Sequence, residues 1–567
     1  MMSQTATKKT ALAQTPIAII EETTNSLPRA ASPEEVGISS QAILNLLDEY
    51  DKQGYEYHGL MILRHGKVAF ETYRAPYAKE IPHSIYSFSK SVAATSIGFA
   101  VEEGLLSLHD PVGKFFPEYR PKKNAERWDK ITIWHVLTMT TGFAFNVFHQ
   151  NSNPDWVKDY LHSHLRDEPG SVFHYTNENA YLISVLIRRI SGQTLFEYLK
   201  PRLFDPLGID VPYSEVDGAG NQGGGWGIIW KLEDSAKFIQ CYLNNGKWNG
   251  KQIIPEWWAV EATKTQVSNA DNIKADSKVG YGYQFWMCSL PNTFACRGMF
   301  CQQGVGMRDH DAVFVYVGAE ADEQKPYDVI YPHFPAGFLD ESEKHEADET
   351  VLKELKSRAE NLTFPAPPVS KRISVLEEKC NNNVLRLRKH LFLNTIGFPL
   401  SLLPMTVNQM ALDRAGHIDN VYLDFKENEV FFTWQEGKKA QWINTIPLGL
   451  DGKYREGRIN LSGFELDTYS YANWEDDKTL LLNIRPIQTC CSRTLRVEFK
   501  SHDRVKIIPR STPSFKSVAD NLYHLSHAFL NNSKPLCALS KFLFSIAPAV
   551  MEANFHGKLK SRKQFKR

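Results

Sequence analysis

The hydrophobic pattern in the first two thirds of the chain alternates between strand-like runs and helix-like segments. Residues Ala42 to Tyr50 have helical spacing, and two apolar runs on either side of His65-Gly66-Lys67 predict a β-hairpin. Small and apolar residues from Ser87 to Glu103 predict a mostly buried helix, which Gly104 would end. A second hairpin is expected from Gly298 to Val317. This part of the chain therefore predicts a mixed α/β domain.

The pattern changes after a proline-rich stretch at Phe364 to Pro368, where we place a domain boundary. Residues Lys371 to Leu393 look helical, whereas Ile418 to Ile508 alternate as strands do. The predicted organisation is a list of five parts: a flexible arm at 1–30, the α/β domain at 31–365, a linker with a helix at 366–415, an all-β domain at 416–510, and an extension with a basic tail at 511–567.

Charge and composition narrow the classes of partner. The 567 residues contain 65 Lys and Arg against 65 Asp and Glu, so no overall field would attract nucleic acid. The basic run at 558–567 is expected to be a solvated tail. No signal peptide is apparent, and the apolar stretches Leu391 to Met405 and Leu536 to Met551 are interrupted by proline or lysine. We therefore expect no nucleic-acid partner and no membrane span; the sequence leaves the oligomeric state open.

The eight cysteines are too few for a disulfide framework and lack the CxxC spacing of a zinc ribbon. Scattered reduced thiols are typical of a cytoplasmic protein. The adjacent pair Cys490-Cys491 is expected to consist of two unpaired thiols that point to opposite faces of a strand.

A Ser-x-x-Lys motif, Ser87 to Lys90, stands at the start of the predicted buried helix. Residues three apart share one helix face, and a serine in the first turn has free backbone N–H groups beside it. Such N–H groups suit a nucleophile whose attack creates an oxyanion. A buried lysine has a lowered pKa, so Lys90 could accept the Ser87 proton. The alternative is a surface serine and lysine on an exposed helix.

A partner motif, Tyr175-Thr176-Asn177, lies in a loop between Pro169-Gly170 and the helix that begins near Ala180. A buried tyrosine hydroxyl near a lysine can relay a proton, and an asparagine amide can hold both the lysine and a substrate carbonyl. The Tyr-x-Asn pattern also occurs at Tyr242 and Tyr471, but only the first instance stands between a turn and a helix.

These motifs lie within segments whose order is typical of a known family: IYSFSKSVAATSIGFAVEEGLLSLHDPVGKFFPEY, ITIWHVLTMTTGF, PGSVFHYTNENAYLISVLIRRISGQTLFEYL, GGGWG and YLNNGKWNGKQIIP. From about Ala31 to Thr363 the chain resembles the serine β-lactamase-related hydrolases, close to class C β-lactamases, family VIII-type carboxylesterases and D-aminopeptidases. The resemblance implies an α/β fold, in which an antiparallel sheet flanked by helices carries a helical lobe, followed here by the all-β domain.

The same resemblance implies a role for each motif residue. Ser87 is the acylated nucleophile, Lys90 and Tyr175 are the general base and acid, and Asn177 orients the substrate and the lysine. The backbone N–H groups of Ser87 and Gln302 would form the oxyanion hole. No metal ion and no organic cofactor is required.

The third family motif, a strand with KTG, HxG or a variant, departs from the pattern in this chain. The matching stretch runs from Arg297 to Gln302, with Met299 where a lysine or histidine is usual and Cys301 in place of glycine. Without that cation a penicillin-like carboxylate lacks its expected anchor, unless Arg297 or Arg308 substitutes. Cys301 is expected to be a buried small side chain that could also narrow the cleft.

The sequence therefore predicts a cytoplasmic serine hydrolase that acts on a small ester or amide through an acyl-enzyme, as a carboxylesterase does. One alternative is a β-lactamase or D-amino-acid peptidase. An alternative of another class is a catalytically silent binding or assembly protein on the same fold, because a fold alone does not decide function.

Overall fold

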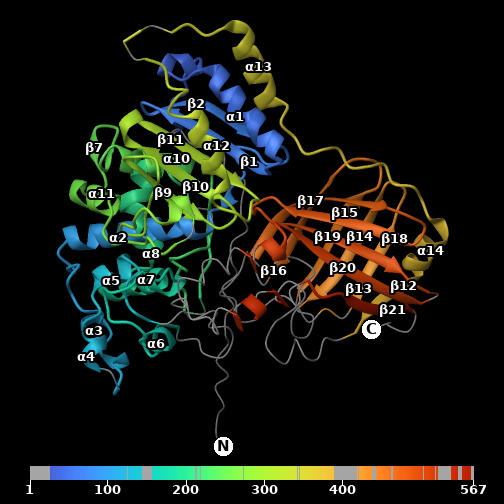
Figure 1. The fold of residues 1–567 in the computed structure, drawn as a ribbon. Helices are drawn as coiled ribbons and strands as arrows, with labels where there is room; N and C mark the ends of the chain where they lie inside the picture. Colours follow the sequence, from blue (N-terminus) through green and yellow to red (C-terminus); the bar gives the residue numbers. More distant parts are fainter. Residues whose placement is uncertain are drawn as a thin grey trace, which may run out of the picture.

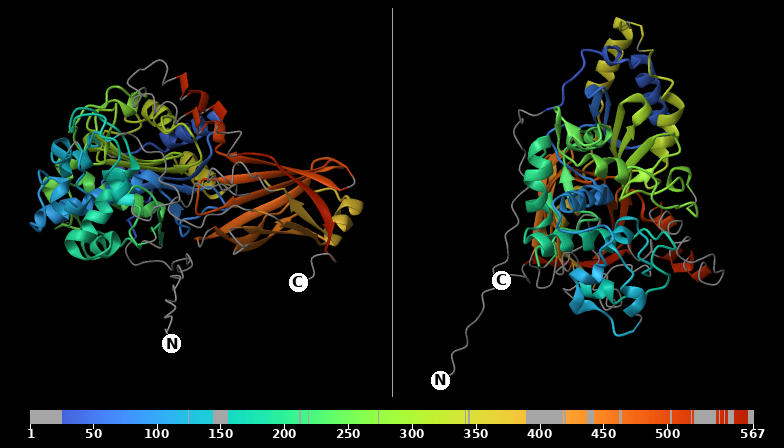
Figure 2. Two further views of the ribbon diagram at one scale, coloured as in Figure 1. Left: turned by 90° about the horizontal axis from the view of Figure 1, so that it is seen from below. Right: turned by 90° about the vertical axis from the view of Figure 1, so that its left-hand side faces the viewer.

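The protein folds into an α/β domain and a C-terminal β-barrel that lie side by side (Figure 1, Figure 2). The computed structural model describes residues 26–143, 156–388, 418–520 and 538–562, except for 124, 211–212, 218, 273, 341, 344, 419, 437–441, 462–463, 502, 518, 540, 544 and 547–551.

A six-stranded antiparallel sheet forms the centre of the first domain, in the order β2-β1-β11-β10-β9-β8. Its strands are β1 (Tyr57–Arg64), β2 (Lys67–Tyr73), β8 (Trp286–Met287), β9 (Thr293–Gly298), β10 (Gln302–Met307) and β11 (Ala312–Gly318). Strand β1 is buried at every position. Alternate residues of β1 belong to two hydrophobic cores: Met61 and Leu63 to one, and Leu60 and Ile62 to the other. The strand is buried on both sides because helices cover both faces of the sheet.

The helices fall into three groups. Helices α1 (Ser40–Gln53), α12 (Lys325–His333) and α13 (Glu349–Glu360) pack together on one side, and α10 (Leu232–Leu243) packs on the other. The helical lobe contains α3 (Val112–Phe115), α4 (Ala125–Trp128), α5 (Ile133–Leu137), α6 (Trp156–Leu161), α7 (Asn177–Ser191), α8 (Leu195–Leu199) and α9 (Asp205–Leu207), with α11 (Glu256–Ala262) further along the chain. Short strands β3 (His83–Ser84), β4 (Tyr213–Ser214) and β5 (Ile228–Trp230) form a small sheet, and β6 (Lys247–Trp248) pairs with β7 (Lys251–Gln252).

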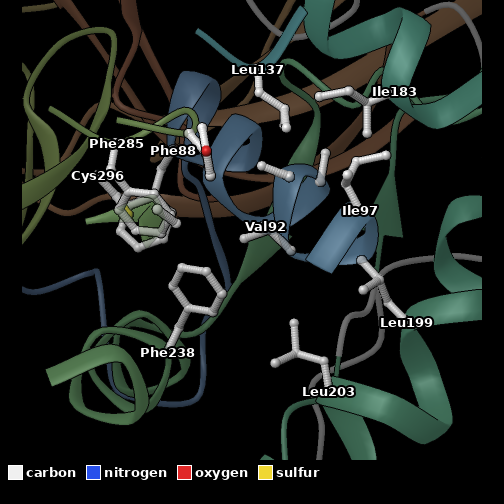
Figure 3. Close-up of a cluster of buried hydrophobic side chains, with 14 of the residues drawn as sticks. Phe88, Val92, Ile97, Leu137, Ile183, Leu199, Leu203, Phe238, Phe285 and Cys296 are labelled. Atoms are coloured by element: carbon white, nitrogen blue, oxygen red, sulfur yellow. The ribbon is translucent and has the colours of Figure 1, made fainter. Parts of the chain in front are cut away.

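Helix α2 (Ser89–Glu102) runs through the core between the sheet and the helical lobe. Every residue from Ser89 to Ala100 is buried, as a helix without a polar face requires. Figure 3 shows Val92 and Ile97 of this helix among side chains of the lobe and of α10. The sequence prediction of a buried helix here is confirmed. The α-helix begins at Ser89, preceded by a 3₁₀ turn at Tyr86–Phe88 that contains Ser87.

The C-terminal domain is an antiparallel barrel in the order β15-β14-β13-β12-β21-β20-β19-β18-β17-β16, closed by a pairing of β15 with β17. Its strands are β12 (Asn383–Leu387), β13 (Asn420–Phe425), β14 (Glu429–Glu436), β15 (Trp442–Gly449), β16 (Arg455–Leu461), β17 (Phe464–Trp474), β18 (Thr479–Pro486), β19 (Ser492–Phe499), β20 (Arg504–Thr512) and β21 (Phe555–Ser561). Alternate residues such as Phe432, Trp434 and Trp474 fill its core.

The predicted fold class, an α/β domain followed by an all-β domain, is confirmed, but the barrel extends beyond 416–510 on both sides. The expected helix at Lys371 to Leu393 is shorter, because α14 (Ser374–Asn382) leads directly into β12. Strand β12 pairs with β21, so part of the expected solvated tail is a barrel strand. Pairing between segments so far apart in the sequence closes an otherwise open sheet edge, and no local pattern reveals it.

Among the described residues, no helix combines the length and the apolar character needed to cross a bilayer.

Candidate active site

Ser87 and Lys90 meet at the N-terminal end of α2. The 3₁₀ turn leaves Ser87 half-buried, whereas Lys90 in the first turn of α2 is only 1% exposed. Their spacing brings Lys90 Nζ to 2.9 Å from Ser87 Oγ. The alternative of a surface serine and lysine on an exposed helix is therefore wrong, because the helix is buried.

Lys90 Nζ has three oxygen partners. Besides Ser87 Oγ, they are Asn177 Oδ1 at 2.7 Å and the backbone carbonyl of Gly225 at 2.8 Å. An ammonium group would donate to all three oxygens. A neutral amine has two N–H groups for the amide and carbonyl oxygens, so its lone pair would face the Ser87 hydroxyl. The same geometry thus holds the lysine before and after it accepts a proton.

The electrostatics of the site favour the neutral amine. Burial lowers the pKa of Lys90 from 10.5 to about 7, although the carboxyl groups of Glu178 and Glu323 raise it in part. Near neutral pH a large fraction of Lys90 is consequently unprotonated and able to act as a base.

Tyr175 completes this group of side chains. Its ring lies 4.9 Å from Lys90 Nζ and packs against Trp286, with ring centroids 5.3 Å apart. Burial raises the pKa of Tyr175, although a hydrogen bond with Ser87 opposes the increase. The phenol therefore keeps its proton at neutral pH, and of the two groups Lys90 is the better proton acceptor. The structure thus brings together Ser87, Lys90, Tyr175 and Asn177.

The stretch that matches the third family motif connects two strands of the sheet. Gln302 begins β10 and pairs with Gly298 at the end of β9. A Cβ atom on Gly298 would lie 2.1 Å from the carbonyl oxygen of Ile85, so the absence of a side chain lets β9 approach the segment before Ser87. The assignment of the Gln302 N–H to the oxyanion hole stays a prediction.

Cys301 is fully buried, and its thiol donates to the carbonyl oxygens of Glu320 and Asp322 at 3.4 and 3.2 Å. Burial raises the pKa of this thiol well above its usual value. A reactive cysteine needs a lowered pKa, so Cys301 is a packed side chain.

Both candidate substitutes for the missing cation have protein partners. Arg297 donates to the hydroxyl groups of Tyr327 at 3.0 Å and Ser277 at 3.1 Å. Arg308 donates to Thr263 Oγ1 at 2.6 Å and also contacts Asn245. Arg308 is thereby engaged within the protein, whereas the Nη2 atom of Arg297 is buried and has no hydrogen-bond partner among the described residues.

Within the described part of the chain, no group of three or more His, Cys, Asp or Glu residues could hold a metal ion. The chemistry that the geometry supports is nucleophilic attack by a serine hydroxyl next to a buried amine base.

A family model described as Beta-lactamase matches residues 44–329, which contain the whole constellation. The chain belongs to the β-lactamase family. The predicted family is thereby confirmed, and the six-stranded sheet with its helices is the β-lactamase fold.

Two relatives with assigned names are distant in sequence. The 6-aminohexanoate-dimer hydrolase of Paenarthrobacter ureafaciens is 22% identical over 250 residues, 40% of this chain and 63% of the relative. The β-lactamase of Escherichia coli K12 is 24% identical over 225 residues, 36% and 55% of the two chains. The chain thus spans just over half the length of these two relatives. Among solved structures, that of EstCE1, "a hydrolase with promiscuous acyltransferase activity", is 15% identical with a TM-score of 0.44, and the match covers 51% of this chain and 98% of that one.

Three residues near the β-lactamase-type site were not singled out from the sequence. Gly225 contributes a carbonyl to Lys90, and a Cβ atom there would lie 3.4 Å from Nζ. The GGGWG segment was visible as family-like but carried no assigned role. Burial raises the pKa of the Glu178 carboxyl to about 7 and also raises that of Glu323. No sequence pattern indicates that Glu323, on the β11–α12 connection, acts on Lys90.

Proposed function

We propose that this protein is a serine hydrolase that cleaves a small ester or amide through an acyl-enzyme, with esterase-like specificity. The observation that carries the proposal is the contact of 2.9 Å between Lys90 Nζ and Ser87 Oγ, in a site where burial lowers the pKa of the lysine to about 7.

Each proton in the proposed cycle has a donor and an acceptor. Ser87 Oγ attacks the substrate carbonyl carbon while Lys90 takes the hydroxyl proton. The carbonyl oxygen becomes an oxyanion, which the backbone N–H groups of Ser87 and Gln302 would stabilise. Tyr175 donates its proton to the leaving alcohol or amine and regains one from Lys90. The acyl-enzyme then reacts with a water molecule in the same way, which releases the acid and restores Ser87.

The charges around the site favour a substrate without a carboxylate near the scissile bond. Met299 supplies no positive charge, the Arg308 guanidinium already donates to Thr263 and Asn245, and Arg297 donates from two of its three guanidinium nitrogens. The carboxyl groups of Glu178 and Glu323 would repel an anion to the extent that they are ionised. We therefore rank a neutral ester or amide above a β-lactam or a D-amino-acid peptide.

A comparison of two chromogenic substrates tests this ranking. The release of a chromogenic acetate or butyrate ester is expected to exceed the opening of a chromogenic cephalosporin, and both are expected to be lost in Ser87→Ala. Faster opening of the cephalosporin would favour the β-lactamase alternative.

A catalytically silent binding protein is tested by intact-mass analysis after treatment with a fluorophosphonate. A mass gain in the wild type that is absent in Ser87→Ala supports the hydrolase. No adduct on well-folded wild-type protein would favour the binding role. As to location, we propose the cytoplasm, supported by the absence of a disulfide bond among the seven described cysteines.

A further inference from the structure

The turn between β18 and β19 of the barrel, residues Ile487 to Cys491, reaches into the α/β domain. The backbone N–H of Ser84 donates to the Gln488 carbonyl at 2.8 Å. The hydroxyl of Tyr77 donates to the Thr489 carbonyl at 3.0 Å. Both contacts are buried. The turn is therefore fixed to the segment that leads to the nucleophile.

The two cysteines of this 487–491 turn converge on one side chain. The Cys490 thiol donates to the Tyr86 hydroxyl at 3.5 Å, and Cys491 Sγ lies 3.8 Å from the same oxygen. The two sulfur atoms are 3.6 Å apart. The expectation that they point to opposite faces of a strand is wrong, because they stand in a turn before β19 begins. Their common partner, Tyr86, directly precedes Ser87.

Tyr86 also links the nucleophile to the third family motif. Its ring meets that of Phe300 edge-on, with centroids 5.5 Å apart and an interplanar angle of 83°. The two cysteines, Tyr86 and Phe300 belong to one small buried cluster, against which Met299 packs. The cluster thus touches both segments to which we assign an oxyanion N–H group.

The backbone of these segments is held in an unfavourable conformation. Tyr86, Phe300 and Cys301 have φ angles of 45°, 64° and 68°, in the left-handed region that favours glycine. A residue other than glycine prefers a negative φ. It keeps a positive φ only where contacts with the surrounding structure outweigh that preference. For Tyr86 and Phe300, that surrounding packing includes a turn from another domain.

We propose that Cys490 and Cys491 are positioning residues for the hydrolase reaction. Through Tyr86 and Phe300, they hold the Ser87 N–H and the Met299–Gln302 segment in the geometry that an oxyanion needs. The barrel then contributes residues that position the active site, although it is a separate domain. The inference rests on the proposed hydrolase function.

Removal of the two thiols from the full-length chain tests the inference. Cys490→Ala/Cys491→Ala is expected to lower kcat for a neutral ester at least tenfold with KM changed less than threefold, because misplaced oxyanion donors weaken transition-state binding. The acidic limb of the pH profile is expected to stay where it is, because Lys90 is not touched. Each single variant should give an intermediate loss, which provides a milder change if the double variant folds poorly.

A matched control removes a buried thiol of the same domain far from Ser87. Cys380 lies on α14, at the end of the barrel away from the α/β domain (Figure 1). Cys380→Ala is expected to keep kcat within twofold of the wild type, even where it lowers thermal stability.

The outcomes separate the two proposals. Wild-type protein that neither turns over esters nor reacts with a fluorophosphonate at Ser87 would overturn both the hydrolase function and the positioning role. An active wild type together with an equally active, folded Cys490→Ala/Cys491→Ala variant would overturn the positioning role alone. An equal loss of kcat in Cys380→Ala would also overturn it, because the effect would then follow from general destabilisation.

Discussion

The low pKa of Lys90 makes a quantitative prediction for the pH dependence of activity. With the ordinary lysine pKa, roughly one side chain in 3000 would be neutral at pH 7. Burial lowers the pKa from 10.5 to about 7, so about half would be neutral at that pH. This decrease of roughly 3.5 in the pKa corresponds to about 5 kcal/mol of net destabilisation of the ammonium form, after the two carboxyl groups have offset part of the lost solvation. Burial of Lys90 thereby increases the amount of active base about a thousandfold.

We expect kcat/KM for a neutral ester to rise with pH up to about 7 and then to level off, because protonated Lys90 cannot accept the Ser87 proton. At pH 5, kcat/KM should be about 100-fold below its plateau. As a control, the fluorescence spectrum should show that the protein is folded both at pH 5 and at the pH of the plateau. A pH-independent kcat/KM between pH 5 and 8 would refute the assignment of Lys90 as the base.

Substitution of Glu178 tests the electrostatic part of this reasoning. Its carboxylate raises the pKa of Lys90, and its own pKa is raised to about 7, so the two groups titrate together. Glu178→Gln should move the acidic limb to lower pH, because the carboxylate that raises the pKa of Lys90 is removed. Glu360→Gln, at the exposed end of α13, is the matched control and should leave the limb unchanged. A limb that moves to higher pH in Glu178→Gln would contradict the argument.

Three further predictions concern single contacts. Gly225→Ala places a Cβ atom 3.4 Å from Lys90 Nζ and 3.2 Å from the Asn177 carbonyl, so kcat should fall about tenfold with little change in melting temperature. An unchanged kcat in Gly225→Ala would show that the reaction does not need the close approach of the Gly225 backbone to Lys90. Between pH 7 and 10.5 the unfolded chain binds a proton at Lys90 that the folded chain does not. The free energy of unfolding of the wild type should therefore rise with pH relative to that of Lys90→Met. Urea unfolding of both proteins at pH 7 and 9.5 measures this difference. A difference in unfolding free energy between the two proteins that is the same at both pH values would contradict a lowered pKa of Lys90. Arg485→Met breaks a 2.6 Å ion pair with Glu56 across the domain interface and should cost about 3 kcal/mol at pH 7.

The Arg485 prediction has its own pH dependence. Burial raises the pKa of Glu56, but hydrogen bonding by His58 and the charge of Arg485 outweigh it and lower the pKa to about 2. The stability that comes from this lowered pKa is present above about pH 4.5 and is lost as pH falls towards 2. The difference between Arg485→Met and the wild type should therefore shrink in acid, and a constant difference in urea unfolding would argue against the ion pair.

The local features of the α/β domain could be predicted from the sequence because they depend on short-range patterns. Alternation and helical period predict the β1–β2 hairpin and helix α2, and the three-residue spacing alone places Ser87 and Lys90 on one face. The order of the family-like segments predicts that Tyr175 and Asn177 join them.

Other parts of the site depend on residues that are far apart in the chain. The Gly225 carbonyl, the Glu323 carboxyl and the Cys490-Cys491 pair reach the Ser87 region from separate elements, and no periodicity records such contacts. The pairing of β12 with β21 within the barrel is of the same kind, because the pairing of sheet edges depends on which strands are left unpaired.

The sequence by itself determined the β1–β2 hairpin, the buried helix α2, the family and the motif residues, because secondary structure and motif spacing follow from neighbours a few positions apart. Only the tertiary structure decided which amine loses its solvation, which carboxyl groups act on it, and which distant turn contacts Tyr86, the residue before Ser87. These properties depend on burial and on distances through space, and both arise when the complete chain packs.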